Sequence, residues 1–121
     1  MKTSRLATTL LVLALALGVP ALTFAATPEP QTVTGEILDM SCYLGHGAHG
    51  EKHRKCAQTC LDSGGPMGLL TADGKVYLLV LDHDKMEVYQ SLQKKAADTV
   101  TVTGVVATKD GVTTLAPSAV K

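Results

Sequence analysis

The chain has 121 residues, with eleven basic and eleven acidic side chains, three cysteines, four histidines, three tyrosines, one phenylalanine and no tryptophan. This balanced charge excludes electrostatic binding to nucleic acid, and so few aromatic residues argue against a platform for stacking bases. The length corresponds to one domain with a modest hydrophobic core.

The first 25 residues have the three-part pattern of a cleaved secretory signal. Lys2 and Arg5 make the start basic, and the apolar stretch 6–19 is too short to span a bilayer comfortably. Ala25 ends a cleavage site of small residues. We therefore expect residues 1–25 to be removed on export, which leaves no stable membrane span. The sequence predicts secretion across the inner membrane and a periplasmic location.

All three cysteines lie in the expected mature chain. Export implies an oxidising compartment, where cysteines usually pair. An odd number of cysteines cannot be closed by disulfides within one chain. At least one cysteine must therefore bind a ligand, pair with another chain, react or remain a free thiol.

The first half of the mature chain contains a tether, a strand, a loop and a helix. Residues 26–32 form a proline-bearing tether, and a single domain follows over 33–121. Strand-like alternation over 33–43 leads into a glycine-rich loop at 44–50. The stretch 51–63 has no glycine or proline and begins with an acidic residue, which predicts a helix that the following glycines stop.

The second half is rich in β-branched residues, and its apolar runs are separated by turn signals. Met86, Tyr89 and Leu92 share a spacing that places them on one helical face. Pro117 is expected to end the last strand. The predicted elements are strands at 67–71, 75–81, 99–108 and 112–116, and a helix at 85–97.

These elements predict a mainly β fold with two helices. Five strands with a helix between the third and the fourth match the partly open barrel of the OB fold. The Cys/His helix would then be an insertion after the first strand of a five-stranded OB-like barrel. The rival arrangement is a generic α+β sandwich.

Most of the chemistry of the chain is concentrated in one short segment. Three of the four histidines and all three cysteines fall within 19 consecutive residues. Thiolates and imidazoles are the ligands that zinc and copper prefer. The members of this Cys/His cluster are Cys42, His46, His49, His53, Cys56 and Cys60.

The spacing within the predicted helix is more specific than the composition. At about 100° per residue, His53, Cys56 and Cys60 fall within about 60° of one another on the helix surface. Ala57 and Leu61 flank this stripe and are expected to anchor it to the barrel. The helix would therefore present one nitrogen and two sulfur donors on one side.

Cys42, at the end of the predicted first strand, would face the stripe from the opposite wall. Tetrahedral zinc or a thiolate-bound copper ion suits such a set of donors. The hypothesis is a non-enzymatic metal-binding protein for storage, delivery or sensing, with an exported partner protein where delivery is the task. The predicted ligands are Cys42, Cys56, Cys60 and one histidine, either His53 on the helix or His46 or His49 from the loop.

Two alternatives stay open at this point. A disulfide from Cys42 to Cys56 or Cys60 would stabilise a small domain by about 2–4 kcal/mol, and the barrel would then be a binding module for a protein or a sugar. Alternatively, Cys56 and Cys60 would form a thiol-disulfide redox pair, although the C-x-x-C spacing is absent.

The stretch 39–71, DMSCYLGHGAHGEKHRKCAQTCLDSGGPMGLLT, resembles a signature of small exported bacterial proteins of unassigned function. The resemblance extends over nearly the whole mature chain. It implies the OB-like barrel and the Cys/His cluster, and it implies no reaction. The matching positions are Asp39, Cys42, Tyr43, Gly45, His53, Cys56, Cys60, Gly64, Pro66 and Gly68.

Overall fold

The computed structural model describes residues 27–121, so the predicted signal segment 1–25 lies outside the described residues. Within the described part, no helix is long and apolar enough to cross a membrane. In chain order the elements are β1 (Gln31–Asp39), α1 (Met40–His46), the 3-10 helix η1 (Glu51–His53), α2 (Arg54–Asp62), β2 (Met67–Leu70), β3 (Val76–Leu79), the 3-10 helix η2 (His83–Lys85), α3 (Met86–Gln93), β4 (Thr99–Lys109) and β5 (Val112–Val120).

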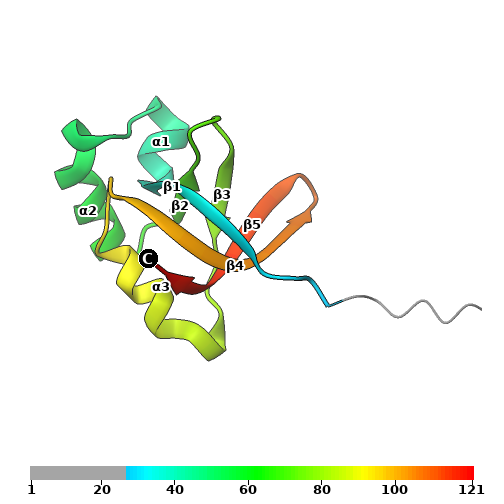
Figure 1. Cartoon of the computed structure of the whole chain (residues 1–121). Helices are drawn as coiled ribbons and strands as arrows, with labels where there is room; N and C mark the ends of the chain where they lie inside the picture. The colour runs from blue at the N-terminus through cyan, green and yellow to red at the C-terminus, as the bar shows by residue number, and fades with distance from the viewer. Residues whose placement is uncertain (1–26) are drawn as a thin grey trace, which may run out of the picture.

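The five strands form a closed barrel in the order β1-β2-β3-β5-β4, with β4 returning to β1. Neighbouring strands are antiparallel except β3 and β5, which are parallel. Helix α3 lies between β3 and β4 in the chain. The predicted five-stranded OB-like barrel with a Cys/His helix inserted after the first strand is therefore confirmed, and the insertion contains a further helix, α1, that was not predicted (Figure 1).

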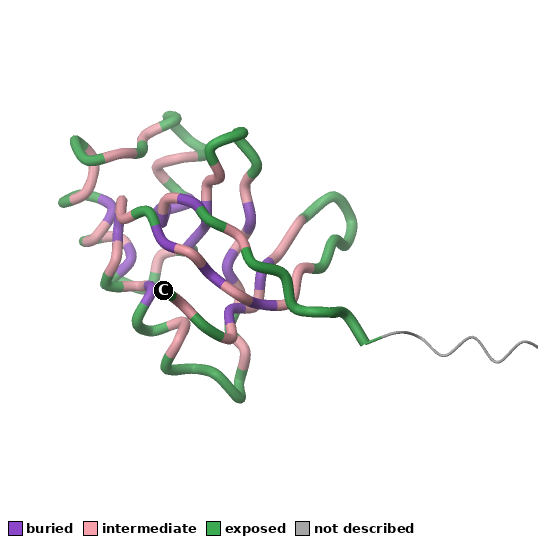
Figure 2. The backbone as a smooth tube through the Cα atoms, in the orientation of Figure 1, coloured by how far each residue is buried: buried purple, intermediate pink, exposed green. Residues whose placement is uncertain are grey.

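The core fills the barrel because alternate side chains of each strand point inward. Figure 2 shows the buried positions along the strands and on the inner faces of the helices, with the exposed ones at the turns. Helix α2 contributes Ala57 and Leu61 to this core, as the sequence predicted. The other buried members are Ile37, Met67, Leu69, Tyr77, Leu79, Leu92, Ala96, Val100, Val102 and Leu115.

The segment between β1 and β2 differs from the prediction at two places. The predicted helix 51–63 is divided into η1, which ends at His53, and α2. The strand ends at Asp39, and Cys42 lies on the short helix α1 instead of on the strand. The predicted loop at 44–50 is correspondingly shorter, because α1 continues to His46. Gly47 then ends the helix with a φ of 67°, a left-handed conformation that glycine adopts at low cost. In Figure 1, α1 and α2 lie on the same side of the barrel.

The last strand also differs, because β5 continues through Pro117 to Val120. Pro117 is paired with Gly104 next to a shift in the register of β4 and β5. Proline is tolerated at such an irregularity because its missing N–H costs no ladder hydrogen bond. The second helix is shorter than predicted: α3 ends at Gln93, and Ala97 has a φ of 61°, outside the right-handed helical region.

Candidate metal centre

Helix α1 is positioned by the buried carboxylate of Asp39. This residue is 2% exposed and is the N-cap of α1. Its side-chain oxygens accept hydrogen bonds from the backbone N–H groups of Ser41 and Cys42, each at 3.2 Å. These are two of the N–H groups that a helix leaves without an internal partner. The cap therefore fixes the point at which the chain turns from β1 and presents Cys42.

Met40 fixes α1 to the neighbouring strand. Its backbone N–H donates to the carbonyl of Pro66 at 2.9 Å, and its side chain is buried. The thioether lies over Gly68 of β2, where an added Cβ would come within 2.2 Å of the Met40 sulfur. The absence of a side chain at Gly68 therefore allows α1 to sit close to the barrel.

Helix α2 is held by hydrogen bonds to the end of α3 and to the segment between α3 and β4. The Arg54 guanidinium donates to the carboxylate of Asp98 at 2.6 Å and to the carbonyl of Ala96 at 2.7 Å. The Gln58 amide donates to the carbonyl of Gln93 at 2.7 Å. Together with the buried side chains of α2, these contacts fix the helix that carries Cys56 and Cys60.

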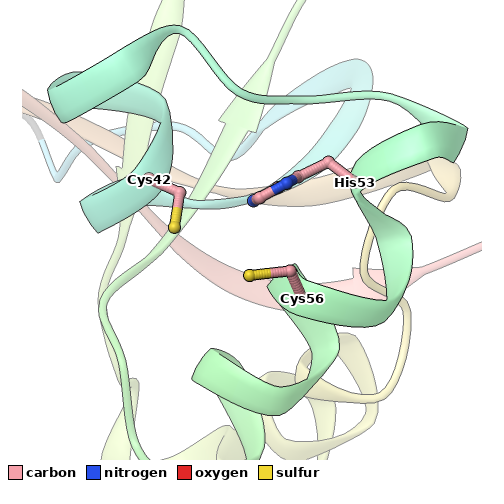
Figure 3. Close-up of side chains that lie close together, drawn as sticks. All are labelled: Cys42, His53 and Cys56. Atoms are coloured by element: carbon pink, nitrogen blue, oxygen red, sulfur yellow. The ribbon is translucent and has the colours of Figure 1, made fainter.

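Thiol and imidazole side chains that could hold a metal ion point toward one another from α1, η1 and α2. Donor atoms of Cys42, His53 and Cys56 all lie within 4.8 Å of one another. Figure 3 shows Cys42 projecting from α1, and His53 and Cys56 projecting from η1 and α2 into the space between them. These three residues form what we call the outer site.

A second group of donors adjoins the outer site. Atoms of Asp39, Cys42 and Cys60 also lie within 4.8 Å of one another, and we call this group the inner site. The two sites share Cys42. No such group among residues 27–121 holds Cys56 and Cys60 together. Cys42 is therefore the one cysteine that both groups contain, with Cys56 on one side of it and Cys60 on the other.

The His53 ring contains a buried atom without a partner. Its Nε2 atom has no hydrogen-bond partner within the described part of the chain. Buried polar atoms in folded proteins almost always have a partner, so this nitrogen calls for an explanation. A metal ion held jointly with two thiolates would supply one, since neutral imidazole is a common metal ligand. The donor set of the outer site therefore fits a zinc or a copper ion.

Asp39 shifts the acidity of the neighbouring thiols. The hydrogen bond from the Cys42 thiol to the Asp39 carboxylate, together with burial, raises the pKa of Cys42 to about 12. Burial, followed by the charge of Asp39, raises the pKa of Cys60. Burial alone would raise the pKa of Asp39, but the hydrogen bonds that it accepts outweigh this effect and lower it. Metal binding at Cys42 must therefore displace a firmly held proton.

His46 and His49 lie outside both sites. His46 is exposed at the end of α1. The Nδ1 atom of His49 lies 3.3 Å from the carboxylate of Glu36, which also accepts the backbone N–H of Gly50. The His49 ring packs edge-on against Tyr43, with centroids 5.9 Å apart. The ligand roles of these two histidines stay a prediction.

Asp39 is the residue whose role the sequence did not reveal. It belongs to the shared signature, but its spacing alone did not separate it from an ordinary acidic residue. A recognisable signal was present, because Asp followed by a run without glycine or proline is typical of a helix N-cap. The chain passes close to both Asp39 and Cys60 at Gly65, where an added Cβ would lie 2.8 Å from the Cys60 carbonyl oxygen and 3.5 Å from the Asp39 carboxylate.

No protein-family model matches the chain, and comparisons with curated proteins and with solved structures give no significant match. The resemblance to small exported bacterial proteins therefore rests on the sequence signature. The structure itself contains a five-stranded mixed β-barrel and a Cys/His cluster, in which all three cysteines are free thiols.

The role of Asp39 leads to a testable pair of substitutions. In Asp39→Asn the charge is lost while a capping side chain remains, so the pKa of Cys42 should fall below its wild-type value. The measurement is the ultraviolet absorbance of thiolate against pH in metal-free protein, with Cys42→Ser identifying the contribution of that thiol. Asp39→Ala should also lower the free energy of unfolding by about 1 kcal/mol, because the cap is lost. An unchanged thiol titration in Asp39→Asn would contradict the assigned contact.

Proposed function

We propose that this protein binds a zinc or copper ion outside the cytoplasm and that it stores, delivers or senses this ion without catalysing a reaction. The observation that carries the proposal is the outer site. Two thiols and one imidazole from different helices come within 4.8 Å of one another, and the buried Nε2 of the imidazole has no hydrogen-bond partner among residues 27–121. Such a soft donor set is typical of zinc and copper sites.

The number of protein ligands would depend on the ion. Structural zinc sites are almost always four-coordinate, so zinc would need a donor in addition to Cys42, His53 and Cys56. Cys60 is the best candidate for this fourth position, because its thiol already lies beside Cys42 in the inner site. His46 and His49 are the other proposed donors, and both would have to move toward the site.

The exposure of the outer site suits the transfer of an ion. Cys56 is exposed, whereas Cys42 and Cys60 are partly buried and Asp39 is fully buried. A thiolate or imidazole of a partner protein could therefore approach an ion at Cys56 without unfolding of the barrel. This asymmetry favours delivery to, or collection from, an exported partner.

The location outside the cytoplasm is a proposal that rests on the sequence of residues 1–25. When the full chain is expressed in a Gram-negative bacterium, we expect the protein in the periplasmic fraction with an intact mass that begins at Ala26. A full-length protein that stays in the cytoplasm would contradict this location.

The metal-binding proposal predicts a selective effect of two histidine substitutions. His53→Gln should weaken binding of zinc or copper(I) at least about tenfold, the size of effect reported when even the supporting residues of a metal site are changed. His83→Gln is the matched control, because His83 is exposed on η2 and lies outside both sites. The measurement is equilibrium dialysis of the reduced, purified protein with metal analysis of both compartments.

Cys56→Ser extends the same test to a thiol donor. It should weaken binding at least as much as His53→Gln, and its fold should be intact because Cys56 is exposed. Equal affinities for the wild type, His53→Gln and Cys56→Ser would overturn the proposal, as would an equal loss in His83→Gln.

A further inference from the structure

The position of Cys42 limits which disulfides this protein forms. The Cys42 thiol lies within 4.8 Å of the thiol of Cys56 in the outer site and of the thiol of Cys60 in the inner site. Among the described residues, Cys56 and Cys60 do not share a site. A disulfide needs its two sulfur atoms about 2.0 Å apart, so small movements suffice only for pairs that contain Cys42. The redox pair of Cys56 and Cys60 considered from the sequence is therefore not the one that this geometry favours.

Cys42 is also the ligand that the two sites have in common. A disulfide through Cys42 removes one donor from the outer site and one from the inner site at the same time. A sulfur atom in a disulfide is no longer a thiolate and is not the ligand that a metal site requires. Oxidation at this one residue therefore competes with metal binding in either site.

The three thiols differ in access to reagents in solution. Cys56 is exposed on α2, while Cys42 and Cys60 are partly buried. Thiol–disulfide exchange requires direct attack of a thiolate on a disulfide sulfur, so access decides which thiol reacts first. The Cys56 sulfur is therefore the first to react with an external disulfide. The Cys42 sulfur lies close enough to react next with the Cys56 sulfur.

The two helices differ in how firmly they are held. Helix α2 buries Ala57 and Leu61 in the core and is clamped through Arg54 to the chain before β4. Helix α1 has only seven residues and buries only Met40. The approach of the two sulfur atoms is therefore accommodated by α1 and by side-chain rotation at Cys42.

From this arrangement we infer that a bound metal ion and a Cys42–Cys56 disulfide are alternative states of the outer site, so that exchange with an external disulfide releases the ion. The inference rests on the proposed function. It also accounts for the odd number of cysteines: in the oxidised state Cys60 remains a thiol beside the buried carboxylate of Asp39.

The exchange balances in two steps. Cys56 sulfur attacks one sulfur of a small external disulfide, forms a mixed disulfide and expels one thiolate, which takes up a proton. Cys42 sulfur then attacks the Cys56 sulfur, forms the internal disulfide and expels the second thiolate, which is protonated in turn. The protein loses two electrons, the external disulfide gains them, and the metal ion leaves because two of its ligands are consumed.

The test begins with the reduced full-length protein loaded with whichever of zinc and copper(I) it binds more tightly. Oxidised glutathione is then added, free thiols are counted after alkylation, and released metal is measured with a chromophoric chelator. We expect the free thiols to fall from three to one as the metal is released in proportion. The oxidised protein should bind the ion at least about 100-fold more weakly, and reduction should restore binding.

Variants identify the disulfide. Cys56 and Cys60 lie in the same tryptic peptide, after Lys55 and up to Lys75, so the matched variants assign the partner of Cys42. In the metal-free protein, Cys60→Ser should still form the disulfide and keep no free thiol. Cys56→Ser should react at least about tenfold more slowly, because the exposed thiol is lost.

Three outcomes would overturn the inference. They are a disulfide without Cys42, a Cys42 disulfide that leaves the metal bound, and metal-loaded protein that keeps all three thiols in oxidised glutathione. Failure of the proposed function is recognised earlier, because the reduced protein would then bind neither ion before any oxidant is added. That result would also overturn the inference that metal binding and the Cys42–Cys56 disulfide exclude each other.

Discussion

The arrangement of the cluster depends on one buried carboxylate. Asp39 lies at the junction of β1 and α1, accepts the first free N–H groups of the helix, and is also in contact with the thiols of Cys42 and Cys60. A buried carboxylate is costly unless it is fully hydrogen-bonded, so these contacts are mutually dependent. The same interaction that starts α1 therefore places Cys42 opposite α2 and raises the pKa of its thiol.

The barrel fixes the distance between α1 and α2, on which the candidate metal site also depends. Helix α1 is seated on β2 through Met40 above Gly68, and α2 is anchored by Ala57 and Leu61 in the core. Neither helix is long enough to be stable alone, so both depend on packing against the strands. The converging donors are thus a property of the folded domain, and the unfolded chain would hold them apart.

The barrel and the buried face of α2 could be predicted from local sequence patterns. The barrel followed from alternating strands and turn signals, and the face of α2 followed from helical periodicity, because both depend on neighbouring residues. The predicted position of Cys42 at the end of the strand was wrong. The strand-like alternation continues to Met40, so it gives no sign that Asp39 is the N-cap of a helix. The inner site joins Asp39 and Cys42 to Cys60 of α2, and this contact depends on how α2 packs on the core, which no periodicity in the sequence records.

The most direct test of the central claim is X-ray absorption spectroscopy of the zinc-loaded or copper(I)-loaded protein. For zinc, we expect sulfur ligands at about 2.3 Å together with imidazole nitrogen at about 2.0–2.1 Å. The imidazole signal should weaken in His53→Gln, and the sulfur signal should weaken in Cys56→Ser. An ion coordinated only by oxygen, or an imidazole signal of unchanged strength in His53→Gln, would contradict the account.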